Sequence, residues 1–184
     1  MENYKKLPSM GFAESVKSVL SNLLNFNGRA RRSELWWYWV AYAVIAIIVV
    51  SLFSGFPMLS GIIGTFLQMS LWAVTVRRLH DRGHSGWWVA VAILTSVFIQ
   101  FYIAGSGYYE AMSAVNPDID AAMASLRGPL FPIAGLVSFI VNITIFIFCV
   151  LDGKPEPNKY GPSPKYVQPD DYYDMLSSKN EVQQ

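Results

Sequence analysis

Long stretches without any charged residue constrain this chain more than any other feature of its sequence. No Asp, Glu, Lys or Arg occurs from Leu35 to Val76, from Gly83 to Tyr109, or from Gly128 to Leu151. A helix needs about 18 or more consecutive apolar residues to cross the roughly 30 Å hydrocarbon core of a bilayer. Charged residues make up only 15% of the chain, against about 25% in soluble domains. The sequence therefore excludes an ordinary soluble globular domain and predicts an all-α membrane protein.

The first charge-free stretch is about twice as long as one span, and it divides at Ser54–Pro57, where Gly and Pro favour a turn. A transmembrane barrel would need short segments of alternating polarity, which these runs lack. We therefore predict a four-helix transmembrane bundle. Its expected spans are Leu35–Phe53, Met58–Val76, Trp87–Ala104 and Phe131–Leu151.

The distribution of basic residues predicts how the spans are oriented. Of the 14 Lys and Arg residues, only Arg127 falls between the third and fourth spans. The others lie before the first span, between the second and third, or after the fourth. With four spans these three regions share one side, and the positive-inside rule makes that side cytoplasmic. We expect an N-in, C-in protein of the plasma membrane with no cleavable signal peptide, because residues 1–34 lack a long apolar core.

Two segments outside the membrane should also be helical. The first 34 residues form a cytoplasmic segment in which Phe12–Phe26 is amphipathic, and they are followed by the transmembrane domain 35–151 and a cytoplasmic tail 152–184. The amphipathic segment predicts a short interfacial helix, with packing on the protein's own loops as the alternative. The outer loop 105–128 is long, and it predicts a helix capped at Asn116 and ending near Leu126. The last ten or so residues of the tail are expected to be disordered.

Three polar motifs lie at the predicted cytoplasmic ends of the spans. They are FNGRARRSELWW from Phe26, RRLHDRGHSGWW from Arg77 and DGKPEPNKYGPSP from Asp152. In this order they resemble the bacterial inner-membrane family DUF805, a domain of unknown function, over about Phe26 to Pro164. The resemblance implies a small multi-pass protein of the bacterial inner membrane and implies no reaction. Because the outer loop looks longer than is usual in the family, the resemblance assigns that loop no role.

The arginines of the first two motifs are the candidate site for lipid or anion binding. Guanidinium forks match the geometry of phosphate, and each basic residue near an anionic membrane surface contributes about 1 kcal/mol. One interpretation is general anchoring to anionic lipid, and the other is a bound phosphate-bearing ligand or headgroup. In the same motif Ser33 is expected to cap the first span, and Gly28 to allow a sharp turn before it. The six candidates are Arg29, Arg31, Arg32, Arg77, Arg78 and Arg82.

The other polar residues of the motifs are expected to form a structural network. Asp81 should pair with an arginine of the first or second motif, and Asp152 with another arginine as the chain leaves the fourth span. Tyr160 should pack beneath them and fix the tail. The candidate network comprises Glu34, His80, Asp81, His84, Asp152, Asn158 and Tyr160.

The sequence predicts no metal, no cofactor and no catalytic residue. His80 and His84 have the four-residue spacing of a helical metal site, but the helix should end near Arg82, no third ligand is evident, and the arginines would repel a cation. No Ser or Cys lies in a recognisable nucleophile motif.

Polar residues within the spans predict one further pair. The spans carry no charge, which argues against a proton relay or an ion pump. Gln68 and Asn142 lie at similar depths of roughly 15 and 17 Å, at about 1.5 Å per residue, so a hydrogen bond between them is expected. A polar lining for a small-solute path is the alternative.

Taken together, these features favour a non-enzymatic membrane protein whose arginine-rich cytoplasmic rim engages anionic lipid headgroups or a partner. The expected partners are membrane lipids, a second copy of the chain or another membrane protein, and not nucleic acid. Two alternatives stay open: a component of a small-solute transporter or channel, and a membrane enzyme acting on a phosphate-bearing substrate. An empty pocket where His80, Asp81 and arginines converge would favour the enzyme, whereas arginines already held in ion pairs would favour a structural network.

Overall fold

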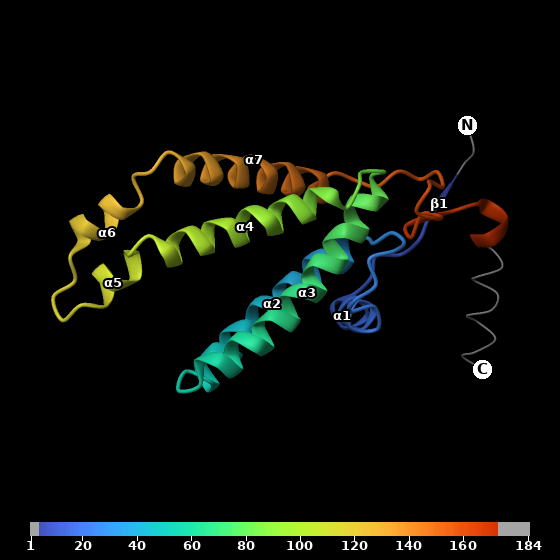
Figure 1. Cartoon of the computed structure of the whole chain (residues 1–184). Coiled ribbons are helices and arrows are strands. Elements are labelled where there is room, and N and C mark those ends of the chain that lie inside the picture. The colour runs from blue at the N-terminus through green and yellow to red at the C-terminus, as the bar shows by residue number, and fades with distance from the viewer. Residues whose placement is uncertain (1–3, 173–184) are drawn as a thin grey trace. The chain divides into compact units, whose positions relative to one another are not determined.

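Four long apolar helices dominate the computed structural model, which describes residues 4–172 (Figure 1). Within these residues, four helices are long and apolar enough to cross a membrane. The prediction of four long apolar helices is therefore confirmed, although the second helix continues past its predicted end at Val76 to Asp81. The helices are α2 (Arg32–Leu52), α3 (Pro57–Asp81), α4 (Trp87–Gly105) and α7 (Leu130–Val150).

Contacts divide the chain into two units. The first unit, up to Gly86 and from Phe148 onward, holds α1 (Phe12–Leu20), α2, α3 and two short strands, β1 (Lys5–Lys6) and β2 (Tyr166–Val167). The second unit, Trp87–Ile147, holds α4, α5 (Tyr108–Ser113), α6 (Ile119–Ser125) and most of α7. The prediction of a single N-in, C-in bundle of all four spans is not tested by these two units and stays a prediction.

In the first unit α2 and α3 lie side by side as an antiparallel pair (Figure 1). The chain reverses at the predicted turn, and Pro57 occupies the first turn of α3, where its missing N–H costs nothing. The Tyr38 hydroxyl bonds to Ser70, and the Tyr42 hydroxyl donates to Gln68 Oε1 at 2.7 Å. Polar bonds between otherwise apolar helices therefore fix the register of the pair.

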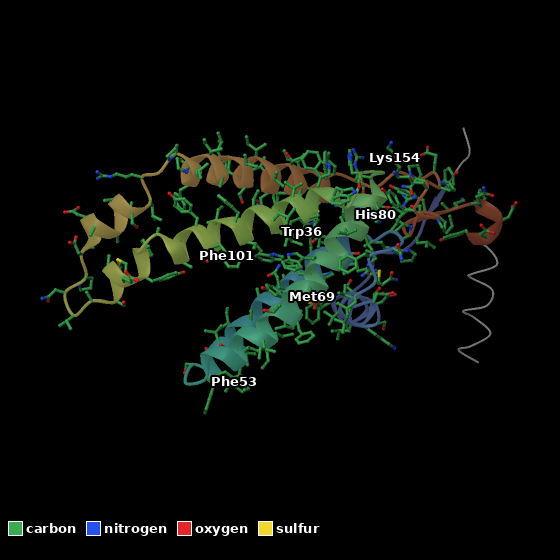
Figure 2. All side chains as sticks on the ribbon, in the orientation of Figure 1. Trp36, Phe53, Met69, His80, Phe101 and Lys154 are labelled. Carbon is green, nitrogen blue, oxygen red and sulfur yellow. The ribbon has the colours of Figure 1, made fainter. Side chains whose placement is uncertain are left out.

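Large apolar side chains stay exposed along the four long helices. Leu52 of α2 is 71% exposed and Phe101 of α4 is 75% exposed. Carbon-rich side chains cover the length of both helices in Figure 2. An apolar surface of this extent is unfavourable in water and suits hydrocarbon, so the helices fit an integral membrane protein.

The segments around the helix pair differ in part from prediction. Helix α1 ends at Leu20, well before the predicted Phe26, and it packs on α2 and α3 by burying Ser15 and Val19. Its apolar residues Phe12 and Leu20 remain about half exposed, at 48% and 51%. The antiparallel pairing of β1 with β2 was not predicted, because two-residue strands are too short to show a sequence periodicity.

The second unit contains two short helices in the outer loop. Helix α5 was not predicted, and it packs against α6. The predicted cap at Asn116 is wrong: Asp118 caps α6, because its carboxylate accepts the Ala121 N–H at 2.9 Å. The Tyr102 ring of α4 lies 5.7 Å from the Phe131 ring at the start of α7. The disorder predicted for the last ten residues falls outside the described part of the chain.

Candidate functional site

Residues of all three polar motifs meet at one end of the α2–α3 pair. In Figure 2 His80 and Lys154 lie at this end, and Phe53 lies at the opposite end of the pair. Nitrogen and oxygen atoms gather around the two labelled residues. We call Arg29, Arg77 and Arg78, together with the carboxylates of Glu34 and Asp81, the arginine cluster.

The way α3 ends places Asp81 in this cluster. Gly83 adopts a left-handed conformation with φ of 84°, which glycine accepts without strain. The Gly83 N–H donates to the His80 carbonyl at 2.9 Å, and the His84 N–H donates to the Leu79 carbonyl at 3.0 Å. These two bonds form a Schellman motif, which closes the helix beside Arg82 as predicted. Asp81 is thus held in the last turn, where only 2% of its surface is exposed.

The Asp81 carboxylate lies between two guanidinium groups. Nε and Nη2 of Arg29 each lie 2.8 Å from Oδ1, and Nη1 of Arg78 contacts Oδ2. The Arg29 and Arg78 side chains are each 1% exposed. One buried carboxylate therefore faces two buried cations, and the excess positive charge needs further compensation.

Backbone carbonyls supply that compensation. Arg29 donates to the carbonyls of Glu156 at 2.9 Å and Gly161 at 3.3 Å, and also to that of Lys154. Arg78 donates to the carbonyls of Cys149 at 3.3 Å, Ala30 at 3.4 Å and Leu151. The chain after α7 therefore wraps its backbone around two arginines that lie far from it in sequence.

Gly153 allows this close approach. A Cβ atom at this position would lie 1.8 Å from Oδ2 of Asp81, which is a severe overlap. The neighbouring Lys154 N–H donates to the Asp81 carbonyl at 3.3 Å. This contact was not predicted, because nothing in the local sequence shows that a distant carboxylate packs against the glycine.

A second buried ion pair joins α2 to α3. Arg77 Nη1 lies 3.0 Å from Oε1 of Glu34, and the two side chains are 6% and 5% exposed. Ser18 of α1 donates to the same oxygen at 3.1 Å, a contact that the sequence analysis missed. Nε and Nη2 of Arg77 have no hydrogen-bond partner among the described residues.

His80, Asn158 and Tyr160 connect the tail to α3. Nδ1 of His80 lies 3.1 Å from the carbonyl of Gly28, so this nitrogen carries the proton and donates. The Tyr160 ring stacks on the imidazole at a centroid distance of 3.7 Å and an angle of 4°. Asn158 Nδ2 donates to the His80 carbonyl at 2.9 Å. Gly28 has φ of 83°, which confirms the sharp turn predicted there.

His84 and Asp152 lie outside this core. His84 stacks on Phe148 at 3.8 Å, and burial lowers its pKa, helped by the charges of Arg82 and Lys154. The carboxylate of Asp152 accepts two hydrogen bonds of 2.6 Å from Lys165, which hold its pKa below the usual range. Arg32 forms a longer ion pair with this carboxylate at 3.8 Å, which confirms the predicted pairing of Asp152 with an arginine.

The other three candidate arginines are more accessible. Arg31 is the N-cap residue of α2, so the predicted cap at Ser33 is wrong, and Arg31 donates to the carbonyls of Pro8 at 2.6 Å and Pro164. Arg82 donates to the Asp152 carbonyl at 2.7 Å, and the Arg32 side chain is 47% exposed. The six arginines therefore divide into three that are buried in ion pairs and three nearer the surface. Among the described residues, no three His, Cys, Asp or Glu side chains gather as a metal site would require.

The two polar residues predicted to pair within the membrane lie in different units. Gln68 accepts a hydrogen bond from Tyr42 within the α2–α3 pair. Asn142 donates to the Ser138 carbonyl of its own helix at 2.8 Å. The Gln68–Asn142 bond stays a prediction.

Comparison with known proteins places these features in a family. The family described as Protein of unknown function (DUF805) matches residues 23–162, which include all three motifs. The inner membrane protein YhaH of Escherichia coli K12 is 28% identical over 156 residues, covering 80% of this chain and 93% of YhaH. The inner membrane protein YhaI of the same strain is 42% identical over 77 residues, covering 39% of this chain and 64% of YhaI. No solved structure matches.

Proposed function

This chain belongs to the DUF805 family, and from that premise we propose that it is a non-enzymatic, multi-pass protein of the inner membrane with both termini in the cytoplasm. The arginine cluster is a structural clamp that joins the three motif segments at the cytoplasmic face. The exposed basic residues around the clamp bind anionic lipid headgroups.

The bonds already made by Arg29 and Arg78 in the clamp carry this proposal. An enzyme for phosphate-bearing substrates would direct free guanidinium groups into an open pocket. Here both oxygens of Asp81 are taken by Arg29 and Arg78, whose other N–H groups meet backbone carbonyls. His80 is likewise covered by the Tyr160 ring. This arrangement supports a structural role for the cluster.

Exposed basic residues support the lipid contact. Lys17 of α1 and Lys154 and Lys159 of the tail are exposed, and each would contribute about 1 kcal/mol near an anionic surface. Helix α1 adds an exposed apolar face, since Phe12 meets the Trp37 ring edge-on at 5.8 Å and both rings are more than two-fifths exposed. Such a face suits the boundary between headgroups and acyl chains.

Cysteine labelling tests the orientation. In a Cys149→Ser background, single cysteines replace Lys159 in the tail, Asn27 before α2 or Asp120 in the outer loop. A membrane-impermeant maleimide added to intact cells should label only the Asp120 variant. Labelling at position 159 or 27 would contradict the proposal.

Lipid enrichment tests the headgroup contact. The full chain and the variant K17Q/K154Q/K159Q are extracted with their surrounding lipids in polymer nanodiscs. We expect the ratio of anionic to zwitterionic lipid to be higher around the wild type, because the variant has lost three exposed charges. Equal ratios would count against lipid engagement by the rim.

A further inference from the structure

A cavity of about 400 Å³ lies beside the start of α2, outside the arginine cluster. Segments from both ends of the first unit form its walls. Lys6 and Leu7 come from the N-terminal segment, Arg32 and Trp36 from the first turns of α2, and Lys165 from the tail. The sequence did not predict this cavity, because no motif contains both the N-terminal segment and the tail segment that form its walls.

The pairing of β1 with β2 builds this cavity. Lys6 pairs with Tyr166 in the antiparallel ladder, and the Leu7 N–H donates to the Lys165 carbonyl at 2.9 Å. Arg31 then holds the two segments together, because its guanidinium donates to the carbonyls of both Pro8 and Pro164. The wall is therefore a defined structure that brings lysines from distant parts of the chain to one place.

The lining of the cavity has an excess of positive charge. Four basic residues contribute to it, whereas Asp152 is the one carboxylate among its described lining residues. That carboxylate accepts a hydrogen bond from Lys165 at 2.6 Å, and its ion pair with the half-exposed Arg32 is longer, at 3.8 Å, beyond hydrogen-bond distance. Lys6 forms no ion pair with any described residue. The charges of Arg32 and Lys6 are therefore the ones available to an anion in the cavity.

The position of the cavity favours a lipid over a free anion. It is lined by Ser33 and Trp36 at the start of a membrane-spanning helix, the depth at which tryptophan meets lipid headgroups. Below Trp36, on the same face of α2, Val40, Val44 and Ile47 are exposed by 44%, 53% and 68%. This apolar stripe provides a surface for an acyl chain directly below the basic cavity.

We propose that this cavity binds the phosphate group of an anionic membrane lipid, with Arg32 and Lys6 as the main phosphate ligands and the acyl chain along α2. This deepens the proposed function and rests on it, because the cavity must face the cytoplasmic headgroup layer. Unlike the general attraction of the exposed basic residues for anionic lipids, this is one site that binds one lipid molecule.

Native mass spectrometry of the full chain tests the site. The protein is reconstituted in phosphatidylcholine nanodiscs that contain phosphatidylglycerol as a minor component, and the lipid that stays bound after release is identified. We expect one retained phosphatidylglycerol per chain in the wild type. Because two basic contacts of about 1 kcal/mol each are lost, R32Q/K6Q should retain about thirtyfold less of this lipid. Unchanged retention in this variant would overturn the proposal.

Two further variants distinguish binding at one specific site from the effects of misfolding and of general electrostatic attraction to the protein surface. D152N removes the carboxylate that competes with phosphate, so it should raise retention, a change that misfolding would not produce. K17Q/K159Q lowers the rim charge outside the cavity and should leave the single lipid bound. If D152N lowers retention, or if K17Q/K159Q abolishes it, the site is not the one proposed.

Competition with inorganic phosphate tests whether the cavity binds the phosphate of a lipid or a free phosphate ion. We expect phosphatidylglycerol to remain bound when inorganic phosphate is added, because the acyl chain contributes to binding. If inorganic phosphate binds and the lipid is not retained, the cavity is a soluble-anion site and the inference fails. A loss of anionic enrichment in K17Q/K154Q/K159Q with unchanged retention in R32Q/K6Q would instead refute the inference while leaving the proposed function intact.

Discussion

The two units of this chain are held together by different kinds of interaction. In the first unit, buried ion pairs connect residues far apart in sequence, such as Arg29 with Asp81 and Glu34 with Arg77. In the second unit, the hydroxyls of Thr95 in α4 and Thr144 in α7 bond to carbonyls of their own helices. Directional polar bonds thus specify the first unit, whereas the helices of the second are specified mainly by length and hydropathy. The same type of substitution should therefore change the stability of the protein more in the first unit than in the second.

The largest difference in stability loss between the two units is expected when a carboxylate is replaced. Asp81→Asn leaves two buried guanidinium groups without a counter-charge, and breaking a buried pair costs about 3–5 kcal/mol. Asp120→Asn changes an exposed carboxylate of the outer loop and should cost much less. Thermal denaturation of the detergent-purified proteins measures both. Similar losses in the two variants would show that the ion pairs do not distinguish the units.

The next difference is expected for a glycine. Gly153→Ala would place a methyl group against the Asp81 carboxylate, and such overlap typically costs about 1–3 kcal/mol. Gly135→Ala in α7 meets no atom within 4 Å and should cost nothing. The same denaturation assay compares them, and a stable Gly153→Ala protein would mean that the tail does not pack closely on α3.

These two residues also show how far the sequence could predict the site. Pairing of Asp81 with an arginine was expected, because a carboxylate among arginines near the bilayer needs a counter-charge. The sequence could not show that two arginines share it, or that carbonyls from Cys149 to Gly161 complete their bonds. Backbone carbonyls are present at every residue, so no residue type marks the ones that a distant guanidinium will meet.

The spans were more predictable than the contacts at their ends. Hydropathy and length identify each helix from its own residues, so the start of α4 at Trp87 was predicted correctly. The partner of Asp152 depends on where β2 lies, and β2 has no sequence pattern of its own. The sequence therefore predicted an arginine partner, which Arg32 supplies at 3.8 Å, but it did not predict the closer partner Lys165.

A smaller difference is expected for aromatic rings. Tyr160→Leu removes the stacking on His80, and aromatic pairs are worth about 0.5–1.5 kcal/mol beyond their buried area. Tyr109→Leu in α5 alters a ring that is 54% exposed and should cost less. Limited proteolysis would report the first change locally, since release of the ring should expose the chain after α7. Equal protection of the tail in Tyr160→Leu and wild type would contradict this role.

The smallest effect is expected for Asp152, whose carboxylate is 48% exposed. Ion pairs this accessible contribute about 1 kcal/mol or less, so Asp152→Asn should reduce thermal stability only slightly. Its pKa is lowered in the folded protein by the hydrogen bonds from Lys165. Its contribution is therefore complete above the unfolded value of about 4 and is lost as the pH falls through the lower folded value.

Comparing the acid stability of Asp152→Asn and wild type isolates this pair. The difference between them should be constant near neutral pH and should shrink below about pH 4, as the wild-type carboxylate takes up its proton. High salt should shrink it further, because the pair is accessible to solvent ions. A difference that persists unchanged in strong acid would mean that the Asp152 side chain acts through packing or neutral hydrogen bonding rather than through charge. The exposed Asp152–Lys165 pair would then stabilise the protein without its charge, whereas the buried Asp81 pairs depend on charge. The polar bonds of the first unit would therefore not all act in the same way, and the comparison of the two units would have to treat these pairs separately.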